Sequence, residues 1–345
     1  MRILHIIPEE KFTNPFIRFI KAHFNESDHT ILSYNKSLKT IRNSEEKLSN
    51  KTSLSRILFF IYQLNKAEKI ILHGLFSSHL ILILLIQPFL LKKCFWVIWG
   101  GDLYYYNSRS RTFKSNIYEY ARKIVIRRLG GFITQVKNDY ELVKLWYGVK
   151  GKYHYCFMYP SNLYKEYTNE KITTKSSKLI IQLGNSSDKS NNHIEILDKL
   201  ARYKDKDIEI ICPLSYGDKR QANIVKEYGN NLFGKKFVPI LDFLKIDEYI
   251  ELLNKVDVAI FNHERQQALG NITTLLGLGK KVYIREEVST WAFCQDHKLK
   301  VYSLNDSLEK IFEKMDINLS TNNIKNVKKR FSEEKLIEDL NNIFR

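Results

Sequence analysis

The sequence predicts an α/β protein made of two doubly wound, Rossmann-like parallel sheets. Short apolar runs rich in β-branched residues alternate with longer amphipathic stretches along the chain, which is the pattern of strand–helix units in parallel sheets. A chain of 345 residues is also longer than one ordinary domain, and the pattern restarts after a polar stretch near its middle. We therefore expect a first domain at residues 1–165, a second at 175–320 and a C-terminal helix at 321–345.

The first half contains five apolar runs of strand length. They cover residues 2–7, 30–34, 69–73, 95–99 and 131–134. Pro15 opens a helical pattern at 15–24, because proline is tolerated in the first turn of a helix. A second amphipathic helix is expected at 54–64. Residues 35–52 are polar and rich in Lys, Asn and Ser, so we expect a loop with some helix there.

The second half repeats this order. Strands are expected at 179–183, 208–212, 236–238, 256–261 and 281–284. The helices between and after them are expected to end at Leu200 and to cover 219–230, 249–253, 272–279, 290–297, 305–315 and 321–344. Gly279 is expected to stop the helix at 272–279, since glycine readily adopts the left-handed conformation found at helix ends.

The bulk composition favours a negatively charged partner. The chain carries 55 basic and 38 acidic residues, a net charge of +17, which suits an anionic membrane, phosphorylated substrates or nucleic acid. Nucleic acid is disfavoured, because no zinc-ligand spacing, RNP-like aromatic motif or basic heptad region occurs. Four widely spaced cysteines indicate reduced, buried thiols of a cytoplasmic protein. The short, polar-flanked start is typical of a first strand rather than of a signal peptide.

Two stretches of the first half bear on membrane association. Residues 79–91 are the most hydrophobic segment, but they fall short of the ~20 residues needed to span a bilayer. They are expected to form either a buried helix or an interfacial helix with Lys92 and Lys93 at the lipid headgroups. The basic, aromatic-bearing residues 109–128 form either a solvated helix face or a surface suited to anionic lipids.

Polar loops follow four strands of the second half. Because the carboxyl ends of parallel strands meet at one sheet edge, where open α/β folds bind ligands, these loops favour a nucleotide-sized pocket over simple helix caps. Arg265 and the helix start near Gly270 suit a pyrophosphate, since a guanidinium and free N–H groups both bind anions. The candidate binding residues are Gly184, Asn185, Ser186, Asn191, Tyr216, Glu264, Arg265, Gln266, Gln267, Gly270, Asn271 and Glu286.

The first half offers two candidate catalytic residues. Asp102 follows a strand and two glycines, so we expect an exposed carboxylate that a ligand can approach closely. The alternative for Asp102 is a helix N-cap. His73 also ends a strand and is a second candidate base, although a lone histidine beside glycine is more often structural. No carboxylate pair has metal-ligand spacing, so we expect neither a metal nor a cofactor.

Five segments, in order along the chain, carry a resemblance to a known family. They are 72–75 (LHGL), 96–104 (WVIWGGDLY), 183–194 (LGNSSDKSNNHI), 265–270 (RQQALG) and 285–286 (RE). Together they resemble glycosyltransferase family 56. Its known members transfer 4-acetamido-4,6-dideoxygalactose (Fuc4NAc) from a TDP-sugar onto an undecaprenyl-pyrophosphate-linked disaccharide in enterobacterial common antigen synthesis.

The resemblance implies a GT-B fold, with an acceptor domain first, a nucleotide-sugar domain second and a cleft between them. It also implies a peripheral protein at the cytoplasmic face of the bacterial inner membrane. Gly101 stands where family members have Ala, and Ala268 and Leu269 stand where they have Gly and Ile. A UDP- or GDP-sugar donor, or an O-antigen or capsule acceptor, therefore stays open. A non-catalytic nucleotide- or polyanion-binding protein is the alternative of another class.

Glycosyl transfer would give the candidate residues distinct roles. The departing nucleoside diphosphate needs positive charge, which Arg265 and the N–H groups near Gly270 are placed to supply. The acceptor hydroxyl needs a base or an orienting partner, for which Asp102 is the first candidate. Glu264 and Glu286 are expected to bind hydroxyl groups of the sugar or ribose.

Overall fold

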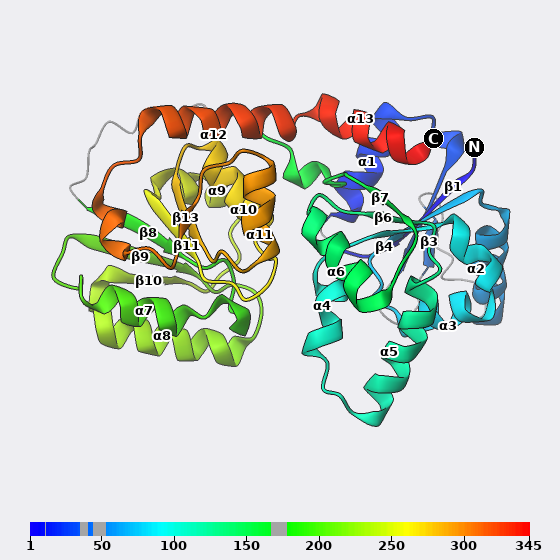
Figure 1. The fold of residues 1–345 in the computed structure, drawn as a ribbon, viewed down its shortest axis with the longest axis horizontal. Helices are drawn as coiled ribbons and strands as arrows, with labels where there is room; N and C mark the ends of the chain where they lie inside the picture. Colours follow the sequence, from blue (N-terminus) through cyan, green and yellow to red (C-terminus); the bar gives the residue numbers. More distant parts are fainter. Residues whose placement is uncertain (11, 35–40, 44–52, 167–177) are drawn as a thin grey trace. The chain divides into compact units, whose positions relative to one another are not determined.

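The computed structural model describes residues 1–10, 12–34, 41–43, 53–166 and 178–345, and it divides into two compact units (Figure 1). Unit 1 comprises residues 1–163 together with 332–345, and unit 2 comprises residues 164–331. Most of the polar stretch at 35–52 and of the expected linker at 166–174 lies outside the described residues. Within the first stretch, residues 41–43 form a strand rather than the loop or helix expected there.

Unit 1 is built on a seven-stranded sheet with the order β3-β2-β1-β4-β5-β6-β7. The strands are β1 (Ile3–Pro8), β2 (His29–Tyr34), β3 (Ile41–Asn43), β4 (Lys69–His73), β5 (Cys94–Val97), β6 (Gly131–Ile133) and β7 (Lys152–His154). All neighbours pair in parallel except β2 and β3 at the edge. The short strands β3 and β7 were not predicted, because each has three residues, two of them polar or charged, and so neither forms an apolar run.

Helices cover both faces of this sheet. They are α1 (Thr13–His23), α2 (Ser53–Lys66), α3 (Ser78–Ile86), α4 (Gly101–Ser108), α5 (Phe113–Ile126) and α6 (Lys137–Tyr147). The apolar segment at 79–91 is not one helix, because α3 stops before Pro88 and the 3₁₀ helix η3 (Pro88–Lys93) follows. One side of α3 is buried through Leu80, Ile81 and Leu84. No helix in the described residues is long and apolar enough to cross a membrane.

Unit 2 is built on a six-stranded, fully parallel sheet with the order β10-β9-β8-β11-β12-β13. Its strands are β8 (Leu179–Leu183), β9 (Ile208–Pro213), β10 (Phe237–Ile240), β11 (Val258–Phe261), β12 (Lys281–Ile284) and β13 (Tyr302–Ser303). The chain starts at β8, winds outward to β10 and then returns to β11 on the other side of β8. The junction of β8 and β11 is therefore the switch point at which doubly wound sheets bind ligands.

The helices of unit 2 lie on opposite faces of its sheet. Helices α7 (His193–Ala201) and α8 (Lys219–Phe233) cover one face, and α9 (Ile246–Lys255), α10 (Leu269–Gly277) and α11 (Ser289–Asp296) cover the other (Figure 1). The expected helix at 305–315 is only a short 3₁₀ helix, η7 (Leu308–Phe312). The predicted architecture of two doubly wound sheets is confirmed.

The C-terminal segment forms two helices where the sequence predicts one. Helix α12 (Ile317–Arg330) ends at Phe331, and Ser332 then caps α13 (Glu333–Phe344) by accepting a hydrogen bond from Lys335 N. Helix α13 belongs to unit 1 and lies beside α1 (Figure 1). There Lys69 Nζ donates to the Ile343 carbonyl at 2.5 Å. The break allows the end of the chain to pack on the first sheet.

Candidate functional site

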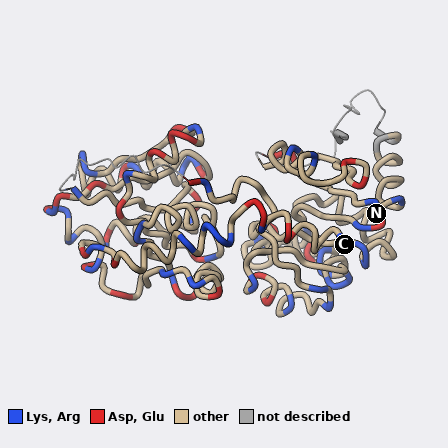
Figure 2. Tube along the Cα trace, turned by 90° about the horizontal axis from the view of Figure 1, so that it is seen from above, with Lys and Arg blue, Asp and Glu red and all other residues tan. Residues whose placement is uncertain are grey.

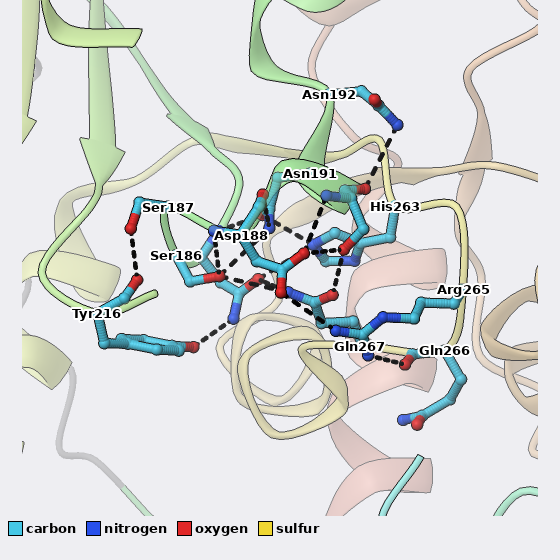
Figure 3. Close-up of polar contacts among 12 residues, drawn as sticks. Ser186, Ser187, Asp188, Asn191, Asn192, Tyr216, His263, Arg265, Gln266 and Gln267 are labelled. Atoms are coloured by element: carbon cyan, nitrogen blue, oxygen red, sulfur yellow. Dashed lines mark hydrogen bonds and ion pairs between the residues drawn. The ribbon is translucent and has the colours of Figure 1, made fainter. Parts of the chain in front are cut away.

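Backbone hydrogen bonds bring three of the four predicted loops together at the switch point of unit 2. Gly184 N donates to Ile260 O at 2.9 Å and Glu264 N to Ser190 O at 3.1 Å, which joins the loops after β8 and β11. Ser187 N donates to Tyr216 O at 2.8 Å and adds the loop after β9. Figure 3 shows the polar side chains that gather there. We call this group, from 184–193, Tyr216 and 262–271, the switch-point cluster.

His263 is the centre of the switch-point cluster. It is 3% exposed, and its Nε2 lies 3.0 Å from both Asn185 Oδ1 and Asn191 Oδ1. Amide oxygens only accept hydrogen bonds, so Nε2 must carry the proton. Burial, followed by the charge of Arg265, lowers the pKa of His263 to about 3. His263 is therefore a neutral donor that holds the β8 loop against the β11 loop.

Gly184 allows this packing. Its φ of +67° is left-handed, and a Cβ there would lie 2.6 Å from His193 Nε2 and 2.8 Å from Asn191 Oδ1. The same Asn191 oxygen accepts from Asn185 N at 3.1 Å. His193 is buried, and both of its ring nitrogens lack a hydrogen-bond partner among the described residues. Burial lowers the pKa of His193 to about 4, so the ring is neutral.

Arg265 is only loosely held. Its Nη2 lies 3.4 Å from Asp188 Oδ2, and its Nη1 lies 3.4 Å from the Gln266 carbonyl. The other carboxylate oxygen of Asp188, Oδ1, accepts a hydrogen bond from Ser190 N at 2.9 Å. Burial opposes ionisation of Asp188, but these Ser190 hydrogen bonds and Arg265 outweigh it and leave its pKa below the usual value. The Arg265 guanidinium is partly exposed. Its long contact with Asp188 can therefore be replaced by a shorter ion pair with an anionic ligand.

The start of α10 faces the same cluster without a side-chain cap. Ala268 takes the N-cap position in the left-handed region, at φ +55°, and no side chain accepts from the first turn. The first turn contains Gly270 and Asn271, whose Oδ1 accepts from Tyr249 Oη at 2.8 Å. The N-terminus of a helix carries unpaired N–H groups and a partial positive charge. Next to Arg265, it forms a site suited to an anion.

A second polar group lies beside β12. Arg285 donates from Nε to Asn262 Oδ1 at 2.5 Å and from Nη2 to Glu195 Oε2 at 2.6 Å. These residues border an open hollow with a volume of about 240 Å³, slightly below the ~300 Å³ at which typical ligand pockets begin. It is lined by Glu195, Lys199, Asn262, Glu264, Arg285, Glu287, Val288, Leu304 and Asn305.

The candidate binding residues differ in how closely they join the switch-point cluster. Gln267 Nε2 lies 3.3 Å from Ser186 Oγ, inside the cluster, whereas Gln266 points away from it (Figure 3). Glu264 is exposed and lines the hollow. Glu286 is exposed at the end of β12, and no hydrogen bond among the described residues joins it to the cluster.

Several residues that form hydrogen bonds at this edge of the sheet were not identified from the sequence. The residues missed are Asp188, Ser190, Glu195, Tyr249, Asn262 and His263. His263 and Asn262 directly follow the apolar run of β11, and this position was the available signal. Their partners are 23 to 78 positions away in sequence, so no local pattern could assign the contacts.

Asp102 in unit 1 differs from the expectation of an exposed carboxylate, which was wrong. It is 1% exposed. Its Oδ1 accepts from Trp99 N at 3.0 Å and Leu103 N at 2.9 Å, and its Oδ2 accepts from Leu75 N at 2.8 Å and Trp96 Nε1 at 2.6 Å. Nor is it the N-cap of α4, a position held by Gly100. Burial raises the pKa of Asp102, against the opposing effect of these hydrogen bonds.

His73 is also fully buried. Its Nε2 lies 3.1 Å from His5 Nδ1, and its Nδ1 lies 2.8 Å from Tyr159 Oη. Burial lowers the pKa of His73 to about 3. Both candidate bases of unit 1 therefore lie beneath its surface, in hydrogen-bond networks.

A family model described as 4-alpha-L-fucosyltransferase, glycosyl transferase group 56, matches residues 22–330. The chain belongs to this family. It is therefore a glycosyltransferase, as its motifs predict. No group of three or more His, Cys, Asp or Glu side chains in the described residues is arranged to hold a metal ion.

Solved structures show that this group 56 transferase has the predicted GT-B fold. Sucrose-phosphate synthase from Thermosynechococcus elongatus matches with a TM-score of 0.70 and 11% identity, over 100% of this chain and 98% of that one. HepE from Anabaena, in complex with UDP, matches with a TM-score of 0.67 and 10% identity, over 99% of both chains. WaaG, a glycosyltransferase involved in lipopolysaccharide biosynthesis, matches with a TM-score of 0.62 and 10% identity, over 100% of this chain and 98% of that one.

Proposed function

We propose that this group 56 transferase moves a deoxy-aminosugar similar to Fuc4NAc from a TDP-sugar to a polyprenyl-pyrophosphate-linked glycan, in the assembly of a bacterial surface polysaccharide. The supporting observation is the set of family motifs at the switch point of unit 2, where an uncapped helix start and a loosely held Arg265 form an anion site. The description of the family as fucosyltransferases supports a 6-deoxy sugar. The likeness to WaaG supports a role in surface polysaccharide synthesis.

We place the donor's pyrophosphate at the start of α10. The helix dipole and the guanidinium of Arg265 would stabilise the negative charge that develops as the sugar–phosphate bond breaks. The Asp188 carboxylate, 3.4 Å from Arg265, would return to the guanidinium after the nucleotide leaves. In this mechanism protein cations replace a divalent metal, so we propose transfer without one. Turnover in EDTA tests that point, and complete loss restored by Mg²⁺ would contradict it.

We assign the rest of the donor to neighbouring parts of the same edge. Tyr216 is half exposed at the end of β9, where its ring could contact the base. The hollow beside Glu264 offers carboxylates and amides that bind hydroxyl groups. Glu286 lies at the rim of this edge and remains a candidate ligand.

We propose that Asp102 and His73 support the acceptor side as orienting groups. The carboxylate of Asp102 already accepts four hydrogen bonds from protein donors. A base must reach the proton that it removes, and a fully buried side chain meets that requirement poorly. Asp102 instead fixes the turn that carries Trp99, through the bond to Trp99 N.

We also propose peripheral binding to an anionic membrane through unit 1. Large apolar side chains are exposed on α3, η3 and α5, and α3 packs against α5. They are Leu82, Ile86, Phe89, Phe113, Ile117 and Tyr120, which we call the apolar patch. Lys92 and Lys114 flank them in sequence. Lys and Arg are spread over both units (Figure 2), so apolar contact and not charge alone would select this face.

Calorimetry with nucleotide sugars tests the donor site. The panel contains TDP-, UDP-, GDP- and CDP-sugars, because HepE holds UDP on the same fold. Arg265→Ala should weaken donor binding by about 1.5–3 kcal/mol, the range for a charge-assisted hydrogen bond. Arg202→Ala is the matched control, since Arg202 is exposed at the end of α7, away from the switch point.

Two results would contradict this proposal. Unchanged donor affinity in Arg265→Ala would remove the pyrophosphate assignment. Binding of no nucleotide sugar, together with tight binding of RNA or DNA, would favour the polyanion-binding alternative. A preference for UDP- over TDP-sugars would keep the site and change only the donor.

A further inference from the structure

Unit 1 contains an unbroken row of five hydrogen-bonded rings. Trp99 Nε1 lies 2.8 Å from Tyr159 Oη, and Tyr159 Oη lies 2.8 Å from His73 Nδ1. His73 Nε2 lies 3.1 Å from His5 Nδ1, and His5 Nε2 lies 3.0 Å from His29 Nδ1. His5 lies within β1, His29 begins β2 and His73 ends β4, whereas Trp99 and Tyr159 lie in loops. We call the row the histidine chain.

The indole of Trp99 sets the direction of the first bond in the histidine chain. An indole N–H can only donate, so Tyr159 Oη accepts from Trp99. We assign the proton of Tyr159 to the bond with His73 Nδ1. With this assignment His73 donates from Nε2 to His5, His5 donates from Nε2 to His29, and all three imidazoles are neutral Nε2–H tautomers.

Burial keeps the histidine chain neutral. His5 and His73 are fully buried, and burial is the main cause that lowers the pKa of both, to about 3 for His73. Burial also lowers the pKa of His29 to about 4, despite the nearby Asp28 carboxylate. The chain is thus a fixed support at neutral pH. Both of its ends are partly exposed, and its outlet at the carboxyl edge of the sheet is Trp99.

Three neighbouring strands present aromatic rings around that outlet. Phe12 follows β1, Phe76 follows β4 and Trp99 follows β5, and these strands are adjacent in the sheet. The Trp99 ring centroid lies 5.6 Å from those of Phe12 and Phe76, at interplanar angles of 90° and 68°. Phe76 is 44% exposed, and Phe12 and Trp99 are partly exposed. We call these three residues the aromatic platform.

The backbone around the aromatic platform has positive φ angles at three positions. Gly74 and Gly100 have φ of +85° and +79°, and a Cβ on Gly74 would lie 2.4 Å from the Phe76 ring. Met158, beside Tyr159, has φ +61°, which is uncommon for a residue with a side chain. Asp102 accepts from Trp99 N at 3.0 Å. Trp99 is therefore held at its backbone by Asp102 and at its indole by Tyr159.

We propose that the aromatic platform binds a sugar ring of the acceptor, and that the histidine chain is its positioning device; this inference rests on the proposed function. The carboxyl ends of parallel strands are where open α/β folds bind ligands, and the donor loops of unit 2 occupy the same edge of their own sheet. A pyranose offers a face of C–H groups that packs on an aromatic ring and hydroxyl groups at its rim. Because the Trp99 N–H is already used by Tyr159, a ligand meets the ring and not its polar edge.

A sugar suits the aromatic platform better than a lipid surface does. The apolar patch lies on α3, η3 and α5, whereas the platform lies in loops at a sheet edge, with Phe76 exposed and Phe12 and Trp99 partly exposed. Rings held in the loops after three adjacent strands match one flat, rigid ligand. A membrane surface instead requires protruding side chains.

Saturation-transfer NMR without any donor tests the platform directly. The probe is methyl N-acetyl-β-D-glucosaminide at millimolar concentration, with wild type, Trp99→Leu and Trp146→Leu. Trp146 is the matched control, a partly buried tryptophan of unit 1 that stacks on Tyr106. We expect wild type and Trp146→Leu to saturate the sugar C–H protons, and Trp99→Leu to weaken binding by about tenfold. Melting temperatures confirm that each variant is folded.

The possible outcomes separate this inference from the proposed function. No saturation in the wild type, or equal loss in both tryptophan variants, would overturn the platform. Loss of vesicle binding in Trp99→Leu without loss of sugar binding would identify it as a membrane contact and would also overturn it. Sugar binding that depends on Trp99, in a protein that binds no nucleotide sugar, would leave the platform standing and refute the transferase reaction proposed above.

Nitrogen-15 NMR tests the histidine chain. The imidazole signals of His5, His29 and His73 should show the neutral Nε2–H form at pH 7. His73→Leu should shift the indole signal of Trp99, assigned from Trp99→Phe, and raise the KM for acceptor about tenfold with a smaller change in kcat. His73→Asn keeps an acceptor near Tyr159 and should restore much of both. An unchanged Trp99 signal in His73→Leu, or Nδ1–H tautomers in the wild type, would overturn the positioning role.

Discussion

The indole N–H of Trp96 donates a 2.6 Å hydrogen bond to Oδ2 of Asp102, inside the core of unit 1. The same carboxylate accepts from three backbone N–H groups, including that of Trp99. A charged side chain in the core is stable only when donors surround it, and Asp102 meets that condition. This carboxylate links the core strand β5 to the turn that carries the aromatic platform.

Replacement of Asp102 by Asn should destabilise the protein. One amide NH₂ would face two buried donors, and each unsatisfied donor costs about 1–3 kcal/mol. We expect a loss of roughly 2–4 kcal/mol, measured by chemical denaturation, with Asp102→Ala at least as unstable. If Asp102 also acts as the base, the folded Asp102→Asn variant will in addition lose about 10²–10⁴-fold in kcat. Stability and kcat measured on both variants separate the two roles.

Replacement of Gly184 by Ala should disrupt the switch-point cluster. The new Cβ would meet the buried His193 ring and Asn191 at less than 3 Å, in addition to the strain of a left-handed backbone. Gly148→Ala isolates that strain, because Gly148 is left-handed at φ +65° and has nothing within 4 Å of the added Cβ. We expect Gly148→Ala to cost about 1 kcal/mol. Gly184→Ala should cost more and also weaken donor binding, and equal melting temperatures for the two variants would contradict the packing argument.

The stability of the protein should fall as the pH drops below neutrality. Burial lowers the pKa of His73 and His263 to about 3 and that of His29 and His193 to about 4. In the unfolded chain these groups titrate near pH ~6.5, so between about pH 6.5 and 4 the unfolded state binds more protons. Each histidine then removes up to about 1.4 kcal/mol per pH unit.

Melting temperatures between pH 7.5 and 5.5 check this effect, because carboxylates contribute little in that range. The slope should steepen as the pH passes below about 6.5. A flat profile would mean that these histidines are accessible to protons in the folded state.

Loss of the apolar patch should weaken membrane binding. Phe113 is 81% exposed, and Ile117 lies one helical turn further along α5. The double change Phe113→Ser and Ile117→Ser should reduce partitioning onto anionic vesicles roughly tenfold. Phe243→Ser removes a well-exposed ring from unit 2 and is the control. Binding should also weaken with salt, since charges are screened over ~10 Å at 0.1 M. Equal partitioning onto neutral vesicles would contradict a role for charge.

Local sequence was sufficient to predict most of the strands and helices. Strands such as 69–73 and 256–261 could be predicted because a parallel strand is buried on both faces and therefore reads as a continuous apolar run. The polar residues that follow them predict the edge of each sheet at which we expect a ligand to bind. The segments missed were short, such as β3 and β13, or depended on a distant partner. Helix α13 belongs to unit 1, and local pattern cannot show which sheet it packs against.

The sequence by itself therefore determined the fold class, the family and the position of the candidate donor loops, because each follows from residues that are close together in the chain. Only the tertiary structure decided which polar side chains are buried and which hydrogen bonds they form. Asp102 is a buried acceptor instead of an exposed carboxylate, and His73 is one member of a row that joins positions 5, 29, 73, 99 and 159. Burial and hydrogen-bond partners set the charge of these groups, and both are made by residues far apart in sequence. The chemistry of a titratable side chain is fixed only when the chain has folded around it.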